Sequence, residues 1–247
     1  MIKKLGLLVL LAVTLVSCQF SETMVLNEDG TGRMSLTMDM SEMMAMMPMQ
    51  DTLDMKMDSV MSFKQLFEEK KDSIATLPRE EQERLKLLEN YQMRILMDPE
   101  KQKMEYEIFT DFKSVAEANN LMEGLNASET MGGSPMGNSN KTKEKKESQE
   151  QPTAVKFTYE NSVFKRDAYI KDPEAFAKIS DSIQSLEAFM EDAMYTIKYT
   201  FPKKIKSVSI KDAKISSDGK TVTFQKPFLA YMKNPDELDV EIILEKN

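Results

Sequence analysis

The sequence contains no histidine and no tryptophan, and its 247 residues include a single cysteine, Cys18. Without histidine the chain cannot form Ser-His-Asp triads, Cys-His pairs or HExxH zinc sites. Carboxylates, lysines and hydroxyls remain, but no spacing among them marks a catalytic set. We therefore expect a protein that is not an enzyme, with no catalytic residues, no cofactor and no bound metal; a carboxylate-based hydrolase is the last-ranked alternative.

The charge balance is acidic. The chain has 41 Asp and Glu against 33 Lys and Arg, and its formal net charge is -8. Nucleic-acid binding depends on neutralising phosphates with Lys and Arg, so nucleic acid is not an expected partner. With 41% apolar and 30% charged residues, the composition is that of a globular protein, and the length allows one or two domains.

The start of the chain has the features of a secretory signal. Lys3 and Lys4 precede an apolar stretch from Leu5 to Val16, which is shorter than the about 20 residues that span a bilayer. Leu15-Val16-Ser17-Cys18 resembles a bacterial lipobox. We predict a signal peptide over residues 1–17, cleavage between Ser17 and Cys18, and attachment of diacylglycerol to the Cys18 sulfur.

An ordinary signal peptide with a chance cysteine is the alternative. A free thiol would be a liability in an oxidising envelope, whereas a lipidated one is not free. Each buried methylene contributes about 0.8 kcal/mol, so two acyl chains suffice for stable anchoring. No later stretch reaches spanning length, and we expect the mature body to lie outside the membrane, attached through its lipid.

Alternating apolar residues predict strands along much of the chain. Residues 19–26 and 33–40 flank "NEDGTG", and residues 91–112 carry "MDPEK" at their centre, so both segments are predicted to be hairpins. Similar alternation predicts further strands within residues 154–167, 195–201, 203–224 and 238–245.

Helical spacing predicts helices over residues 58–76, from residue 78 onward, over 114–125 and over 172–192. Residues 127–152 have almost nothing to bury and are predicted to be a disordered insertion. This insertion divides an N-terminal part, residues 18–126, from a C-terminal part, residues 153–247, that we expect to complete the same domain. The fold class is α+β, with a largely antiparallel sheet and helices packed on one of its faces.

Methionine is the unusual residue of the body: 11 of the 22 methionines lie between Met34 and Met61. Thioethers are soft ligands that select Cu(I), and Met43, Met46 and Met47 fall within one helical turn. A periplasmic Cu(I)-binding protein is therefore the alternative function. Flexible methionines also fill irregular cores, and they line adaptable surfaces that bind an apolar ligand or a partner.

Two stretches resemble known lipoproteins. "ETMVLNEDGTGRMSLTMDMSEMM" (residues 22–44) looks like the opening of a family of small lipoproteins from Bacteroidetes, mostly flavobacteria. "YTIKYTFPKKIKSVSIKDAKISSDGKTVTF" (residues 195–224) is similar to the aromatic strand, "FP" and "DGKTVTF" hairpin of LppM-type lipoprotein domains. The resemblance implies an envelope lipoprotein with a mixed, β-rich domain that binds a lipidic ligand.

Some lipoproteins of that phylum carry an acidic stretch after the cysteine that sends them to the cell surface. Here Glu22 is the only acidic residue of "QFSETM". We therefore expect attachment to the outer membrane facing the periplasm, with a lipidic ligand or another envelope protein as the partner.

Overall fold

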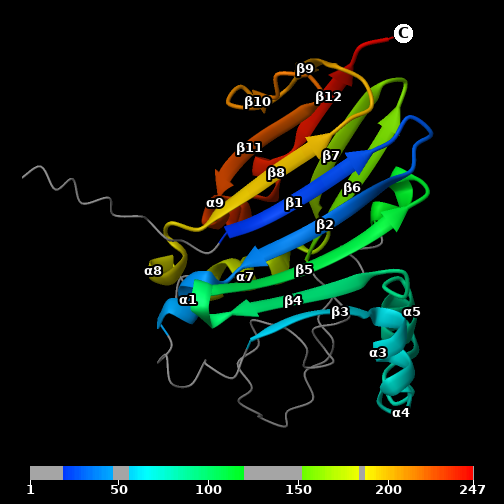
Figure 1. Ribbon diagram of the computed structural model, residues 1–247, viewed down its shortest axis with the longest axis vertical. Coiled ribbons are helices and arrows are strands. Elements are labelled where there is room, and N and C mark those ends of the chain that lie inside the picture. Colours follow the sequence, from blue (N-terminus) through cyan, green and yellow to red (C-terminus); the bar gives the residue numbers. More distant parts are fainter. Residues whose placement is uncertain (1–18, 47–55, 120–151, 184–186, 247) are drawn as a thin grey trace, which may run out of the picture.

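The computed structural model describes residues 19–46, 56–119, 152–183 and 187–246, and within them two β-sheets form the framework (Figure 1). The first sheet has eight strands and the second has four. In spatial order the large sheet contains β10 (Lys214–Ile215), β11 (Thr221–Pro227), β8 (Met194–Thr200), β1 (Gln19–Leu26), β2 (Gly32–Asp39), β5 (Lys103–Phe112), β4 (Gln92–Asp98) and β3 (Met57–Ser62).

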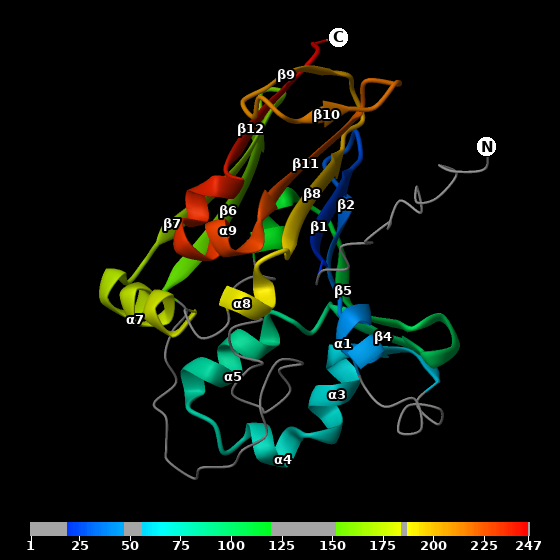
Figure 2. The same ribbon diagram turned by 90° about the vertical axis from the view of Figure 1, so that its left-hand side faces the viewer.

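The small sheet covers only part of the large one. It contains β6 (Thr153–Glu160), β7 (Val163–Ile170), β12 (Val240–Leu244) and β9 (Ile205–Val208). Figure 2 shows it, with helix α9 (Phe228–Lys233), on one side of the large sheet, next to β8 and β1. The other end of the large sheet, formed by β5, β4 and β3, extends beyond it.

The first predicted hairpin is confirmed. In β1 every second residue is buried, and β2 pairs with it antiparallel from Gln19 opposite Asp39 to Leu26 opposite Gly32. Gly30 has a φ of +85°, which an L side chain rarely adopts, and it closes the turn through its N–H to the Asn27 carbonyl. The alternation and the turn residues thus determine this hairpin locally.

One long-range pairing joins the two ends of the sequence. β1 lies parallel to β8, with Gln19 opposite Met194, whereas every other strand pair in the described residues is antiparallel. β1 therefore lies in the middle of the large sheet and has a hydrogen-bonded neighbour on each side.

The closed part of the core lies between the two sheets. Phe164 of β7 is fully buried and packs edge-on against Tyr199 and Phe201, with ring centroids 5.2 and 5.4 Å apart. Phe157 of β6 and Ile242 of β12 are buried in the same cluster. Aromatic pairs of this geometry add to the gain from burial.

The helices are short and lie beside the sheets. They are α1 (Ser41–Met46), α3 (Phe63–Glu69), α4 (Lys71–Ile74), α5 (Arg79–Lys86), α7 (Pro173–Ile183), α8 (Glu187–Met190) and α9. The predicted helix over residues 58–76 is wrong at its start, because Met57–Ser62 forms β3, which pairs antiparallel with β4. Pairing with an otherwise free strand edge overrides the local helical spacing there.

The α+β class is confirmed, but a second sheet takes the place expected for helices. The small sheet, rather than a helical layer, covers the large sheet over β8 and β1 (Figure 2). Among the described residues, none of the helices combines the length and the apolar character needed to cross a bilayer. The insertion predicted over residues 127–152 falls almost wholly outside the described residues, and the division into domains stays a prediction.

Candidate functional site

Eight methionines share one face of the large sheet. Strand register places their positions on the face that also packs against the small sheet, because cross-strand partners point to the same side of a sheet. The members, from β1 to β3, are Met24, Met34, Met38, Met104, Met93, Met97, Met57 and Met61. Methionines that are scattered along the sequence are thus gathered on one surface by strand pairing.

This face is closed at one end and open at the other. On β1 and β8 its side chains are 9% exposed or less. On β4 and β5, by contrast, every position of this face from 93 to 97 and from 104 to 108 remains half-buried, and Met57 on the edge strand is 39% exposed. The small sheet does not extend over these strands.

We call this uncovered surface the open methionine face. Its members come from β3, β4 and β5: Met57, Ser59, Met61, Met93, Ile95, Met97, Met104, Tyr106 and Ile108. None of them is charged, and partial burial raises the pKa of the Tyr106 phenol, so the face is neutral. Met93 and Ile108 pack against the closed core and mark the inner border of the face.

The chemistry available on this face is apolar contact. Methionine side chains are flexible and polarizable, so they adapt to apolar molecules of different shapes. A hollow of about 470 Å³ on the outer surface of the small sheet is different in kind. It is lined by polar groups such as Lys165 and Glu241, which form an ion pair at 2.6 Å, and it does not suit an apolar ligand.

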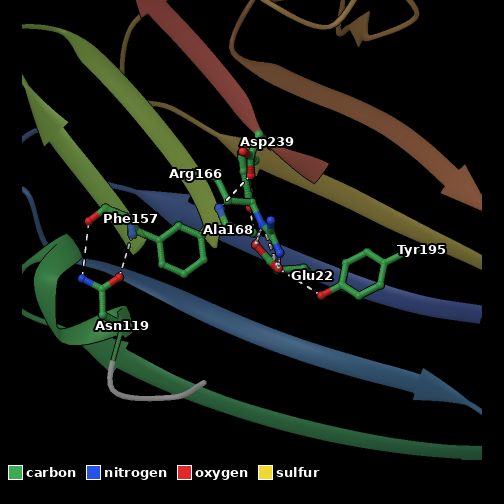
Figure 3. A network of polar contacts seen from close by, with 8 residues as sticks. Glu22, Asn119, Phe157, Arg166, Ala168, Tyr195 and Asp239 are labelled. Carbon is green, nitrogen blue, oxygen red and sulfur yellow. Dashed lines mark hydrogen bonds and ion pairs between the residues drawn. The ribbon is translucent and has the colours of Figure 1, made fainter. Parts of the chain in front are cut away.

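A buried ion pair connects the two sheets (Figure 3). Glu22 of β1 and Arg166 of β7 have fully buried side chains, and the Arg166 guanidinium donates from Nε to Glu22 Oε1 at 3.2 Å and from Nη2 to Oε2 at 3.3 Å. Tyr195 and Tyr199 of β8 also donate their hydroxyls to the Glu22 carboxylate, at 3.0 Å for Tyr195. Four side chains from three strands therefore meet at one carboxylate.

Burial controls the protonation of this cluster. It raises the pKa of Tyr195 and of Tyr199 well above 10, and the negative charge of Glu22 raises both further. Burial alone would lower the pKa of Arg166, but Glu22 and the neighbouring tyrosines leave it well above its usual value. The cluster is closed off from solvent and serves to connect the sheets, rather than to meet a substrate.

Two further polar contacts involve the small sheet, one joining it to the residues after β5 and one within the sheet. Asn119, beyond the end of β5, accepts from the backbone N–H of Phe157 at 2.6 Å and donates to its carbonyl at 3.4 Å, so its amide acts as a neighbouring strand would (Figure 3). Asp239 accepts from the backbone N–H of Ala168 at 2.7 Å, just before β12 begins.

The site residues predicted from the sequence do not belong to the open methionine face. Ser17 and Cys18 lie outside the described residues, and β1 begins at the next residue, Gln19. The backbones of Met43 and Met46 belong to α1, but their side chains, like all of Met47, are not described, so the predicted Cu(I) site there stays a prediction. The described residues contain no group of three or more Asp, Glu or Cys side chains that could hold a metal ion.

Sequence reasoning missed the ion pair, although a signal was present. In "QFSETMVL" the alternation that places Phe20 and Met24 inward also places Glu22 inward. In "VFKRDAYI" the same rule places Arg166 between the buried Phe164 and Ala168. One charged residue at an inward position in each of two strands predicts a buried pair, because an isolated buried charge is too costly.

Comparisons with known proteins give one similarity. No family model matches the chain. No curated protein matches it either, so the resemblance to Bacteroidetes lipoproteins stays a prediction. The fold is weakly similar to the NMR structure of the folded domain of the Mycobacterium tuberculosis LppM protein, with a TM-score of 0.39, 6% sequence identity, and coverage of 93% of this chain and 91% of that chain. No conclusion about ligand or activity follows from a similarity at this level.

Proposed function

We propose that the protein is a lipid-anchored envelope protein, without enzymatic activity, that binds an apolar ligand on its open methionine face. The observation that supports ligand binding concerns the described residues: β3, β4 and β5 present a neutral, methionine-lined face that the small sheet does not cover. Contiguous apolar surface that remains accessible on a folded protein marks binding sites.

The proposed anchor is diacylglycerol on Cys18, and the proposed location is the outer membrane on its periplasmic side. The support is the sequence "KKLGLLVLLAVTLVSC", with its short charged start, its apolar run and its lipobox-like end. Two acyl chains hold a protein of this kind without a spanning helix. An apolar ligand taken from a membrane fits this location.

The anchor is tested by changing Cys18→Ala. We expect the wild-type protein in the membrane fraction and labelled by metabolic palmitate. The variant should lose the label and should leave the membrane fraction after signal processing. An unlabelled wild type, or a variant that remains equally firmly in the membrane pellet, would refute the anchor.

The ligand site is tested on the edge strand, where Met61 and Val60 are neighbours that point to opposite faces. Met61→Glu places a charge on the open methionine face, and Val60→Glu places the same charge on the other side of the same strand. A fluorescent long-chain fatty acid should bind the wild type and the Val60→Glu variant, and should bind Met61→Glu about tenfold more weakly or worse, because a desolvated charge opposes an apolar ligand.

Native mass spectrometry of the wild-type protein purified from membranes completes the test. A co-purified lipid mass would support the proposal. Equal binding of the probe by both variants would place the ligand elsewhere. No bound lipid and no probe binding would refute ligand binding and would favour an envelope protein as the partner of this face.

A further inference from the structure

Strand register brings three methionines into one row at the open end of the large sheet. Met57 of β3 lies opposite Met97 of β4, and Met97 lies opposite Met104 of β5. Directly opposite residues have Cβ atoms about 4.5–5.5 Å apart, so the three side chains leave the sheet side by side. The row joins segments that are far apart in the sequence.

No other row across these three strands has this composition. The next row is Ser59, Ile95 and Tyr106, and the one after it is Met61, Met93 and Ile108. A fourth methionine adjoins the first row: Met40, which follows β2, is 5% exposed and donates its backbone N–H to the Met104 carbonyl at 2.7 Å. Sulfur is therefore concentrated at one edge of the face.

The charged residues beside this row are engaged with one another. Lys56 pairs with Glu100 at 2.8 Å, Asp58 pairs with Arg94 at 2.8 Å, and Lys103 pairs with Glu105 at 2.9 Å. Within their strands, Asp58 and Lys103 alternate with the methionines and so point to the opposite side of the sheet. Within the part of the chain that the structure describes, the donors at the row on the methionine side are thus thioethers, without a carboxylate or an amine.

Packing in a closed core accounts for the row only in part. Met57 is 39% exposed, and Met97 and Met104 keep part of their surface exposed. Thioethers without hard donors select soft cations, of which Cu(I) is the biological example. The flexible side chains allow three sulfurs to converge on one ion.

We propose that Met57, Met97 and Met104 form a thioether site for a soft monovalent cation, Cu(I), at the end of the open methionine face where β3 begins and β4 ends. The site goes beyond the binding of an apolar ligand. It also differs from Met43, Met46 and Met47, the residues that the sequence alone suggested for copper.

The test uses Ag(I), a soft monovalent ion that needs no reductant, on the mature chain from residue 18 carrying Cys18→Ala so that no thiol competes. The row variant combines Met57→Leu, Met97→Leu and Met104→Leu. The matched control, Met61→Leu with Met93→Leu, removes sulfur from the same face of β3 and β4. Leucine keeps the face apolar, so the fatty-acid probe should still bind both variants. A loss of Ag(I) binding can therefore be told apart from a loss of apolar-ligand binding.

The wild type and the control should bind one Ag(I) ion tightly, and the row variant should bind it at least about tenfold more weakly. In protein labelled with ¹³C at the methionine methyl groups, the resonances of Met57, Met97 and Met104 should shift together at one equivalent. Competition with a Cu(I) chelator under reducing conditions should give the same ranking. If circular dichroism shows the row variant unfolded, Met97→Leu alone, at the centre of the row, gives the comparison.

Three outcomes would overturn the site. One is a wild type that does not bind the ion, and another is equal binding by the row variant and the control. The third is a shift at one equivalent that is confined to methionines outside the row, such as Met43 or Met46.

Discussion

Replacing Glu22 with glutamine removes the negative charge between the two sheets while keeping the shape of the side chain. Arg166 would then be a fully buried cation without its counter-ion, because its Nε and Nη2 both bond the Glu22 carboxylate and its Nη1 has no hydrogen-bond partner among the described residues. The hydroxyls of Tyr195 and Tyr199 can still bond the amide oxygen, but they carry no charge.

The expected loss of unfolding free energy is large. Removing one partner of a buried ion pair costs about 3–5 kcal/mol, because the other charge stays desolvated. A domain has only about 5–15 kcal/mol in total, so Glu22→Gln should remove about a fifth of the stability or more. Replacing both members, Glu22→Leu with Arg166→Met, removes the desolvation cost on both sides. It also takes the acceptor from the buried Tyr195 and Tyr199 hydroxyls, so the double variant should recover only part of the loss.

The assay is urea unfolding followed by circular dichroism on the mature chain from residue 18 with Cys18→Ala, for this background alone and with Glu22→Gln, Glu22→Leu, Arg166→Met or the double substitution. The control is Asp58→Asn, which breaks the exposed Asp58–Arg94 pair and should leave the unfolding midpoint almost unchanged. Should Glu22→Gln shift the midpoint no more than Asp58→Asn, or should the double variant be as unstable as the sum of the singles, the reasoning is wrong.

Two more predictions concern the same core. Gly32→Ala should destabilise the fold by about 1–3 kcal/mol in thermal unfolding, because a Cβ there would lie 2.2 Å from the Val25 carbonyl oxygen and 2.4 Å from the Phe112 ring. An unchanged melting temperature would show that these neighbours can move aside without cost. Stability should also fall as the pH rises above about 10, by up to about 1.4 kcal/mol per pH unit for each of Tyr195 and Tyr199, because their raised pKa keeps them protonated in the folded state alone. Changing both to Phe should flatten this dependence in alkaline urea titrations, and an equally steep fall in that variant would contradict it.

The sequence pattern was sufficient to predict strands that pair with a neighbour in the sequence. The hairpins of β1 with β2 and of β4 with β5 follow from alternation plus turn residues that the chain itself displays, such as Gly30 and Pro99. The prediction for the segment of β3 was wrong because Val60 and Phe63 fit the spacing of a helix as well as that of a strand. Only the free edge of β4, which lies about 30 residues later in the chain, decides in favour of a strand.

The candidate site was less accessible to sequence reasoning. The abundance of methionine suggested a cluster, but it directed attention to neighbours in sequence such as Met43 and Met46. The row of Met57, Met97 and Met104 exists only because three strands pair in one register. A one-residue slip of β3 along β4 would turn Met57 to the other face, and no local preference specifies that register.

The position of β1 has a mechanical consequence for the anchored form. The strand begins one residue after Cys18 and is held by β2 on one side and β8 on the other. A lipid on Cys18 would therefore have no slack between bilayer and body. The end of the molecule where β8 starts would rest at the headgroups, and any pull on the acyl chains would load two rows of backbone hydrogen bonds in shear. Extraction from the membrane should then occur before the strand is pulled out of the sheet.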